Sequence, residues 1–354
     1  MKIYILNETN DNRVAITPDI AQKMISSGQE VYVEKGAGVL AGYADKEYAE
    51  NGSIIFNDRS EITNANVIFS INKIEDDILS KLTPKTYIIS GEQNNNKMCK
   101  KYGIISFALN KIPRTTRAQY MDILSSQSSL AGYKAMIEAS HVLNRAIPLM
   151  MTTAGTIPSA KVLVIGAGVA GLQAIATARR LGANVSAYDV RASTKEQVES
   201  LGAKFVNVVS EEKTDGVYAK EMSDKYRKAQ ENSLRNVLPT QDIVITTAQI
   251  PGKKAPILIS NDMIGIMKKG SVIIDLAAKT GGNCELTKVN KKVVKNGITV
   301  IGFDNILNLI PYDASRLYAK NLLSFFELFL DKLAQQPDIS KIDDDIIKAT
   351  LEVL

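Results

Sequence analysis

Short hydrophobic runs alternate with helix-like segments along the whole chain. In the N-terminal third of the chain, five β-rich runs predict strands over residues 2–6, 30–34, 66–71, 86–90 and 103–107. They are apolar at both odd and even positions, so we expect helices to cover both faces of the sheet. Between the first two runs, Thr17, Pro18 and Asp19 predict a helix start with the Thr17 hydroxyl as its cap. Gly28 predicts the end of that helix.

A second series of apolar runs begins further along the chain. Six runs predict strands over residues 161–166, 183–189, 204–209, 242–248, 271–277 and 298–303. They are separated by segments of crossover length, which fits a complete dinucleotide-binding sheet. The predicted fold class is therefore α/β, with two Rossmann-like, doubly wound parallel-sheet domains and a cleft between them.

Two long helical segments lie outside these two series. Residues 118–146 are mostly helical in composition, and residues 314–333 carry apolar side chains at helical spacing. We expect the later helix to return and pack on the first domain, so that the two helices link the domains. The predicted N-terminal domain is then discontinuous, comprising residues 1–124 and 309–354, and residues 125–308 form the NAD(H)-binding domain.

The composition narrows the class of protein. The 354 residues carry 43 basic and 38 acidic side chains, and the resulting net charge of +5 is too small and dispersed to indicate nucleic-acid binding. Two cysteines and one histidine exclude a disulfide scaffold and leave almost no ligands for zinc, so we expect no metal. The sequence shows no signal peptide and no apolar run of about 18 residues. We therefore expect a soluble protein of a reducing compartment.

A glycine-rich motif lies between a predicted strand and a predicted helix. Gly166 allows a tight turn, Gly168 lets the backbone approach a pyrophosphate, and Gly171 lets the helix pack closely on the sheet. The helix N-terminus would offer N–H groups to the phosphates, although a purely structural turn is the alternative. Asp189 ends the next strand and is placed to bind the adenosine ribose, which favours NAD(H) over NADP(H). Arg191 weakens that preference, because arginine can bind a phosphate.

A polar cluster lies where the two strand series meet. Gln119, Asp122 and Ser125 are spaced by three residues and would share one sector of a helix or converge on a ligand from a loop. By sequence alone, a capped helix start with a solvated face is the favoured interpretation. The position at the domain junction, where a nicotinamide should emerge, makes a binding site the competing one.

Several long blocks of the sequence resemble the NAD(H)-binding component, domain I, of the proton-translocating NAD(P) transhydrogenases. That family is related to alanine dehydrogenase and shares its two-domain plan. The similar blocks are residues 13–18, 36–38, 113–135, 166–183, 188–205, 216–222, 246–260 and 270–285. The resemblance therefore spans nearly the whole chain.

The resemblance implies a catalytic, nicotinamide-binding group of residues. Arg114, Asp122 and Ser125 would hydrogen-bond the nicotinamide carboxamide and fix the orientation of the ring. Gln119 would contact the nicotinamide ribose and help to align two nucleotides, and Tyr133 would lie near that site.

The resemblance also implies contacts to the rest of the nucleotide. These are Gly166, Gly168, Val169, Gly171, Asp189, Val190, Arg191, Ala248 and Gln249. Tyr218 would belong to a mobile loop that closes over the bound nucleotide. Gln249 replaces the leucine usual in the family, and Val217 replaces a glycine.

The chemistry of the two related families differs in what it needs from the protein. Hydride transfer between two nicotinamides moves no separate proton, so it needs alignment and exclusion of water. An amino-acid dehydrogenase needs an acid–base group and a cationic clamp for the substrate carboxylate. The lysine of alanine dehydrogenases appears as Ser70, and their catalytic histidine is missing from the stretch that follows. Arg13 is retained, but it also fits a structural ion pair.

The resemblance implies the NAD(H)-binding subunit of a Re/Si-specific NAD(P) transhydrogenase. It would be a separate, homodimeric alpha-1-type polypeptide that passes hydride from NADH to NADP+ held by an NADP(H)-binding subunit. A membrane-spanning subunit would couple the transfer to proton movement, and the chain would lie in the cytoplasm at the inner membrane. Two alternatives remain: an alanine-dehydrogenase-like oxidoreductase with another base, such as Lys73, and a non-catalytic NAD-binding regulator.

Overall fold

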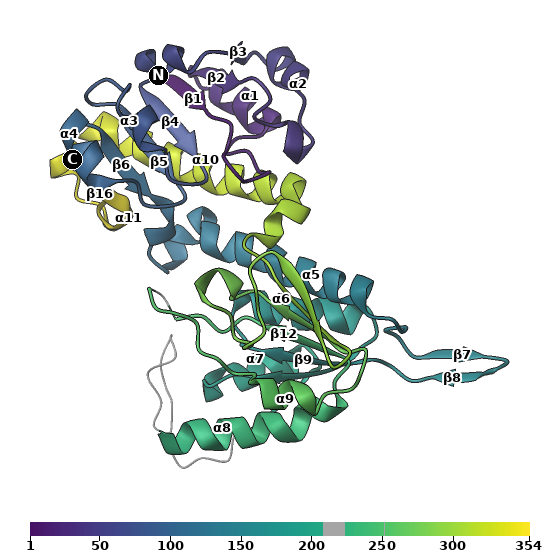
Figure 1. Ribbon diagram of the computed structural model, residues 1–354. Helices are drawn as coiled ribbons and strands as arrows, with labels where there is room; N and C mark the ends of the chain where they lie inside the picture. The colour runs from purple at the N-terminus through teal and green to yellow at the C-terminus, as the bar shows by residue number, and fades with distance from the viewer. Residues whose placement is uncertain (208–223, 251) are drawn as a thin grey trace. The chain divides into compact units, whose positions relative to one another are not determined.

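The computed structural model of the protein describes residues 1–207, 224–250 and 252–354 (Figure 1). The chain forms two compact units: unit 1 comprises Met1–Gln127 and Leu307–Leu354, and unit 2 comprises Ser128–Ile306. Each unit is built around a seven-stranded sheet in which parallel pairs dominate. The predicted α/β class with two Rossmann-like, doubly wound sheets is confirmed.

The sheet of unit 1 has the order β16-β6-β5-β4-β1-β2-β3. Its strands are β1 (Lys2–Ile5), β2 (Glu30–Glu34), β3 (Ile54–Phe56), β4 (Val67–Ser70), β5 (Tyr87–Ser90), β6 (Ile105–Ala108) and β16 (Leu351–Val353). The five predicted strands are present, whereas the short β3 and the antiparallel edge strand β16 are not predicted. The chain runs outward from β1 in one direction and from β4 in the other, so the topological switch point lies between them.

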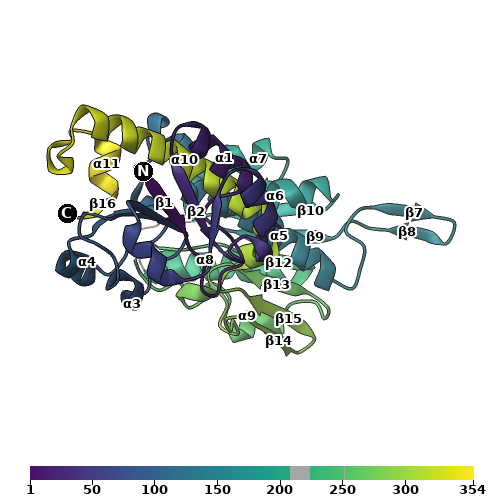
Figure 2. The ribbon, with the colours of Figure 1, turned by 90° about the horizontal axis from the view of Figure 1, so that it is seen from above.

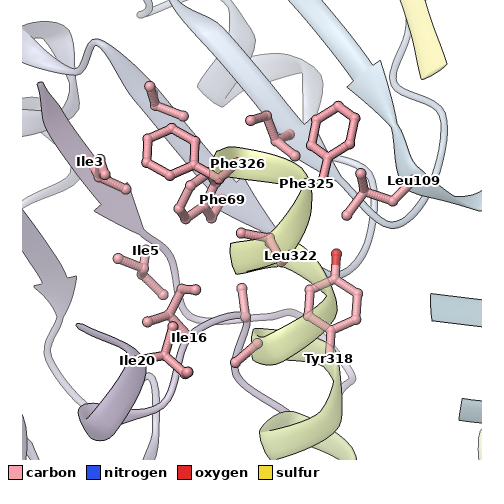
Figure 3. Close-up of a cluster of buried hydrophobic side chains, with 14 of the residues drawn as sticks. Ile3, Ile5, Ile16, Ile20, Phe69, Leu109, Tyr318, Leu322, Phe325 and Phe326 are labelled. Atoms are coloured by element: carbon pink, nitrogen blue, oxygen red, sulfur yellow. The ribbon is translucent and has the colours of Figure 1, made fainter. Parts of the chain in front are cut away.

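Helices cover both faces of this sheet. They are α1 (Pro18–Ser26), α2 (Asp45–Glu50), α3 (Asp76–Leu79), α4 (Asn96–Tyr102), α10 (Pro311–Gln335) and α11 (Asp345–Thr350). Ile3 and Ile5 of β1 pack in one core with α1 and α10, and Figure 3 shows the aromatic side chains of α10 reaching this core. Tyr4 points to the opposite face, into a second core with α3 and α4.

The start of α1 differs in one detail from the prediction. The Thr17 hydroxyl donates to Asp19 Oδ1 over 2.6 Å and makes no bond to a backbone N–H of the helix, so the predicted hydroxyl cap is wrong. Proline at the first helical position sets the start instead. The helix ends just before Gly28, whose φ of +83° is a conformation that glycine adopts readily.

The sheet of unit 2 has the order β11-β10-β9-β12-β13-β15-β14. Its strands are β9 (Lys161–Ile165), β10 (Asn184–Tyr188), β11 (Lys204–Phe205), β12 (Ile243–Thr246), β13 (Val272–Asp275), β14 (Lys291–Lys295) and β15 (Ile298–Gly302). The six predicted strands are present, and the antiparallel β14 at the edge is an addition. The switch point lies between β9 and β12, whose carboxyl ends lead into the segments considered below.

The helices of unit 2 again lie on two faces. They are α5 (Ile123–Val142), which begins in unit 1, α6 (Val169–Arg180), α7 (Lys195–Ser200), α8 (Asp224–Val237) and α9 (Asn261–Gly265). The first three pack in one core, and α8 and α9 pack in the other. A separate two-stranded hairpin, β7 (Met150–Thr152) and β8 (Gly155–Ile157), projects from this unit (Figures 1 and 2). Among the described residues, no helix combines the length and the apolar character that crossing a membrane requires.

Candidate functional site

The glycine loop joins β9 to α6 in unit 2. Gly166 has a φ of +99°, and a Cβ built on it would lie 2.4 Å from Thr247 Oγ1. A Cβ on Gly171 would lie 1.8 Å from the carbonyl oxygen of Gly166. Gly168, the N-cap of α6, has no heavy atom within 4 Å of such a Cβ. The protein itself therefore requires the outer two glycines, whereas Gly168 borders open space at a helix N-terminus that suits an anion.

Asp189 connects the end of β10 to this loop. Its Oδ2 accepts a hydrogen bond of 2.7 Å from the Ala167 N–H. Both carboxylate oxygens also bind the Arg191 guanidinium at 3.0 Å, and Oδ1 accepts the Arg191 N–H at 2.8 Å. The hydrogen bonds from Asp189 raise the pKa of Arg191. Four N–H groups thus match the four acceptor positions of this buried carboxylate, so a ribose hydroxyl would have to displace one of them.

The segment after β12 forms the other side of the switch point. The Thr247 hydroxyl donates to the Gly166 carbonyl at 3.0 Å, which ties this segment to the glycine turn. Ala248 follows and is hydrogen-bonded to the buried Asn283. Gln249, at the position where the family usually shows leucine, is exposed and donates to the Leu276 carbonyl at 3.1 Å. The polar replacement is thus anchored to the backbone just after β13.

The predicted nicotinamide-binding residues form a group in unit 1, at the start of α5. Asp122 Oδ1 accepts the Ser125 N–H at 2.9 Å, and Asp122 Oδ2 accepts the Ser125 hydroxyl at 2.5 Å. This is the capped helix start that the spacing favoured. Arg114 and Gln119 are exposed, with Gln119 in the 3₁₀ turn Thr116–Met121 that precedes the helix.

Tyr133 lies further along α5, in unit 2. The preceding Gly132 packs so closely on the first turn of α6 that a Cβ would lie 2.0 Å from the Ala170 carbonyl oxygen. Tyr133 is 37% exposed and follows this contact directly. Tyr218 and Val217 lie outside the described residues. Within unit 2 the fold therefore brings together the glycine loop, Val169, which is exposed, the 189–191 segment, residues 248–249 and the turn of α5 that carries Tyr133.

Three residues close to this site are absent from the sequence-based prediction. Gly132 has a local signal, because a glycine inside a helical pattern often marks a close approach. Thr247 and Asn283 have no local signal, because their partners lie far away in the sequence. Within the described residues, no cluster of His, Cys, Asp and Glu is arranged to hold a metal ion.

The switch point of unit 1 is occupied by the protein's own polar side chains. Arg13 binds Asp11 through Nε at 2.9 Å and Nη2 at 2.6 Å, and its Nη1 donates to Gln127 Oε1 at 2.8 Å. Burial alone would lower the pKa of Arg13, but the hydrogen bonds from Asp11 reverse this and raise it. The guanidinium is therefore neutralised in place, as the ion-pair interpretation of Arg13 predicts.

Glu8 completes this network beside the end of β4. Its carboxylate accepts hydrogen bonds from the backbone N–H of Ile71 and from the backbone and side chain of Asn72. Burial raises the pKa of Glu8 to about 7, against the opposing effect of these N–H groups. Ser70, at the position of the alanine dehydrogenase lysine, is buried and donates to the Asn72 carbonyl at 2.8 Å. Lys73 is exposed.

Comparison with known proteins agrees with this two-unit organisation. Residues 4–131 match the family model of the alanine dehydrogenase/PNT N-terminal domain, and residues 135–354 match that of the C-terminal domain. In Rhodospirillum rubrum the alpha subunit of NAD(P) transhydrogenase is named in parts, and the chain is 45% identical to the first of them, over 99% of this chain and 95% of that protein. It is 27% identical to an alanine dehydrogenase of Staphylococcus haemolyticus, over 94% and 88% of the two chains.

A solved structure leads to the same family. The crystal structure of transhydrogenase from Sinorhizobium meliloti superposes with a TM-score of 0.85 at 38% identity, covering 100% of this chain and 97% of that one. The two family models together cover nearly all of the sequence. The chain therefore belongs to the alanine dehydrogenase/PNT family, as a relative of the NAD(P) transhydrogenase alpha subunits.

Proposed function

We propose that this chain is the NAD(H)-binding subunit of a Re/Si-specific, proton-translocating NAD(P) transhydrogenase. The observation that carries the proposal is the 45% identity, over 99% of the chain, to the alpha-subunit polypeptide of the Rhodospirillum rubrum transhydrogenase. Bound NADH would supply a hydride from its C4 to the C4 of NADP+ on a partner subunit, leaving NAD+ and forming NADPH. A membrane-spanning subunit would couple the transfer to proton movement and hold the chain at the cytoplasmic side of the inner membrane.

The residues of unit 2 fit the adenosine and pyrophosphate parts of NADH. The open space at Gly168 leaves room for phosphates at the N-terminus of α6. Asp189 would accept hydrogen bonds from the ribose hydroxyls and would repel a 2′-phosphate. Arg191 could otherwise attract that phosphate, but its guanidinium is held by Asp189. The pairing supports NAD(H) rather than NADP(H) as the nucleotide of this chain.

The polar group at the start of α5 fits a primary amide. The Ser125 hydroxyl gives its hydrogen to Asp122, so towards a ligand both side chains present acceptors. The NH₂ group of the nicotinamide carboxamide carries two donors, and the guanidinium of Arg114 would serve its carbonyl oxygen. Gln119 would position the adjoining ribose. None of these groups needs to transfer a proton, which agrees with a reaction that depends on alignment.

The alanine-dehydrogenase-like alternative lacks support at the switch point of unit 1. A substrate carboxylate would need an available cation there, and the Arg13 guanidinium is already bound by Asp11 and Gln127. Ser70 supplies no positive charge. The position that would hold an amino-acid substrate is thus filled by an internal hydrogen-bond network, which favours transfer between two nucleotides.

The projecting hairpin supports a homodimer. The strands β7 and β8 pair only with each other, and every residue in them is exposed, including Met151 at 81% and Ile157 at 39%. An isolated two-stranded hairpin with apolar side chains is marginally stable in water, so we propose that a second copy of the chain covers it. Met151→Asp should shift the protein towards monomer in analytical ultracentrifugation. An unchanged dimer would remove this support.

The decisive experiment separates binding from transfer. The purified chain is titrated with NADH and NADPH, and then mixed with an NADP(H)-binding subunit and an NADP+ analogue in a stopped-flow spectrometer. We expect preferential NADH binding by the chain alone and hydride transfer only after the partner is added. Oxidation of alanine or reduction of pyruvate by the chain alone would establish the dehydrogenase alternative. Binding without transfer, even with the membrane components present, would establish the regulatory one.

A further inference from the structure

Asn283 is a buried side chain whose amide is completely used within the protein. Its Oδ1 accepts the Ala248 N–H at 3.0 Å, and its Nδ2 donates to the Ala248 and Pro256 carbonyls, each at 2.8 Å. The residue has no exposed surface. Both backbone groups of Ala248 are therefore bound by one side chain, as they would be by a neighbouring strand.

The backbone around Asn283 is itself held firmly. Asp275, at the end of β13 and also fully buried, accepts the Asn283 N–H at 2.7 Å and the Thr287 hydroxyl at 2.6 Å through Oδ2. The Asn283 carbonyl accepts the N–H groups of Leu258 and Ile259. These bonds do not involve the Asn283 side chain, so replacing that side chain would release Ala248 while leaving the surrounding backbone pairs in place.

Ala248 lies where a small movement would reach the glycine loop. The hydroxyl of the preceding Thr247 donates to the Gly166 carbonyl, and a Cβ on Gly166 would lie 3.2 Å from the Ala248 nitrogen. Gly166 also touches the first turn of α6 through the close approach of Gly171. The Asn283 amide, the Ala248 peptide and the glycine turn thus form one series of direct contacts across the switch point between β9 and β12.

We infer that Asn283 is a positioning residue of the nucleotide site. It touches no ligand, because it has no exposed surface, and it sets the affinity for NADH by fixing the Ala248 backbone against the glycine turn. Since both polar backbone groups of Ala248 are bound by Asn283, Ala248 contributes to the site through its shape and not through hydrogen bonds to the nucleotide. The inference rests on the proposed binding of NADH in unit 2.

The test compares NADH affinity with stability in the full chain. Asn283→Ala removes all three side-chain bonds, and Asn283→Ser is measured beside it because it leaves less empty volume. Asn94→Ala is the matched control: Asn94 is a buried asparagine of unit 1 that also makes three side-chain hydrogen bonds, to Ile74, Ser90 and Ser106. NADH binding is measured by fluorescence titration, and stability by thermal unfolding.

We expect the two Asn283 variants to bind NADH about tenfold more weakly than the wild type, as the release of a binding segment requires. The Asn94 variant should lose a comparable amount of thermal stability and keep the wild-type affinity. Wild-type affinity in either folded Asn283 variant would overturn the inference, as would failure of both variants to fold, because Asn283 would then be purely structural. A wild-type chain that binds no NADH would overturn the proposed function as well.

Discussion

Substitution of Gly168 by alanine should separate nucleotide binding from folding. The added Cβ meets no heavy atom within 4 Å, and the φ of −79° at this residue is a conformation that alanine adopts without strain. We therefore expect the free energy of unfolding to change by no more than about 0.5 kcal/mol. The open space is needed only when phosphates approach the N-terminus of α6.

The expected effect on binding follows from what that methyl group would displace. The pyrophosphate would be held away from the first N–H groups of α6 and from the positive end of its dipole. Losing such hydrogen bonds costs about 1–3 kcal/mol, which corresponds to an increase of about 5- to 150-fold in the Kd for NADH. The Kd is measured by titrating the fluorescence of NADH, and stability by denaturant unfolding of the same preparations.

Two further glycines of unit 2 provide controls. Gly171→Ala places a methyl 1.8 Å from the Gly166 carbonyl oxygen, so it should destabilise the chain by about 1–3 kcal/mol although alanine is the better helix former. Gly265→Ala, in α9, meets no atom within 4 Å and should change neither property. A Gly168→Ala variant that binds NADH like the wild type would refute the placement of the pyrophosphate at this loop.

Three other substitutions test separate aspects of the proposal. Asp189→Ala should weaken NADH binding by about 1–3 kcal/mol, because it leaves buried N–H groups unpaired and removes the ribose contact; an unchanged Kd would discard that contact. Gln119→Asn should slow single-turnover hydride transfer far more than it weakens binding, and a rate loss explained entirely by affinity would contradict its role in alignment. Because burial raises the pKa of Glu8 to about 7 in the folded chain, the native state holds this proton more tightly than the unfolded state does. The stabilisation from Glu8 is therefore complete at low pH and is lost as the pH rises through about 7, so the unfolding free energy of wild type relative to Glu8→Gln should fall by roughly 2 kcal/mol between about pH 5 and 8; a constant difference would show that Glu8 does not titrate in this range.

Hydrophobic patterning predicted the central strands because each of them is buried on both faces. The runs around Val67–Ser70 and Ile243–Thr246 are apolar at every position or nearly so, and any covering helix satisfies them. Edge strands carry no such signal. Lys291–Lys295 is mostly exposed and lysine-rich, and Leu351–Val353 directly follows a helix, so only pairing with β15 and β6 makes them strands.

Local spacing was informative at the site wherever a function depends on neighbours in the sequence. The strand–glycine loop–helix motif and the Asp122 cap follow from positions a few residues apart. The pairing of Asp189 with Arg191 also connects near neighbours, yet its consequence, a carboxylate whose four acceptor positions are occupied, required coordinates.

The sequence by itself determined the α/β class, the central strands of both sheets and the turn that would hold a pyrophosphate, because backbone propensity and burial periodicity act over a few residues. Tertiary structure alone decided that Arg13 is neutralised by Asp11 and Gln127, and that Asn283 holds Ala248 across the switch point of unit 2. Gln127 is 114 residues from Arg13, and Asn283 is 35 residues from Ala248. Such hydrogen bonds form only when parallel strands bring the ends of distant segments to one edge of a sheet, and no local pattern of residues encodes that meeting.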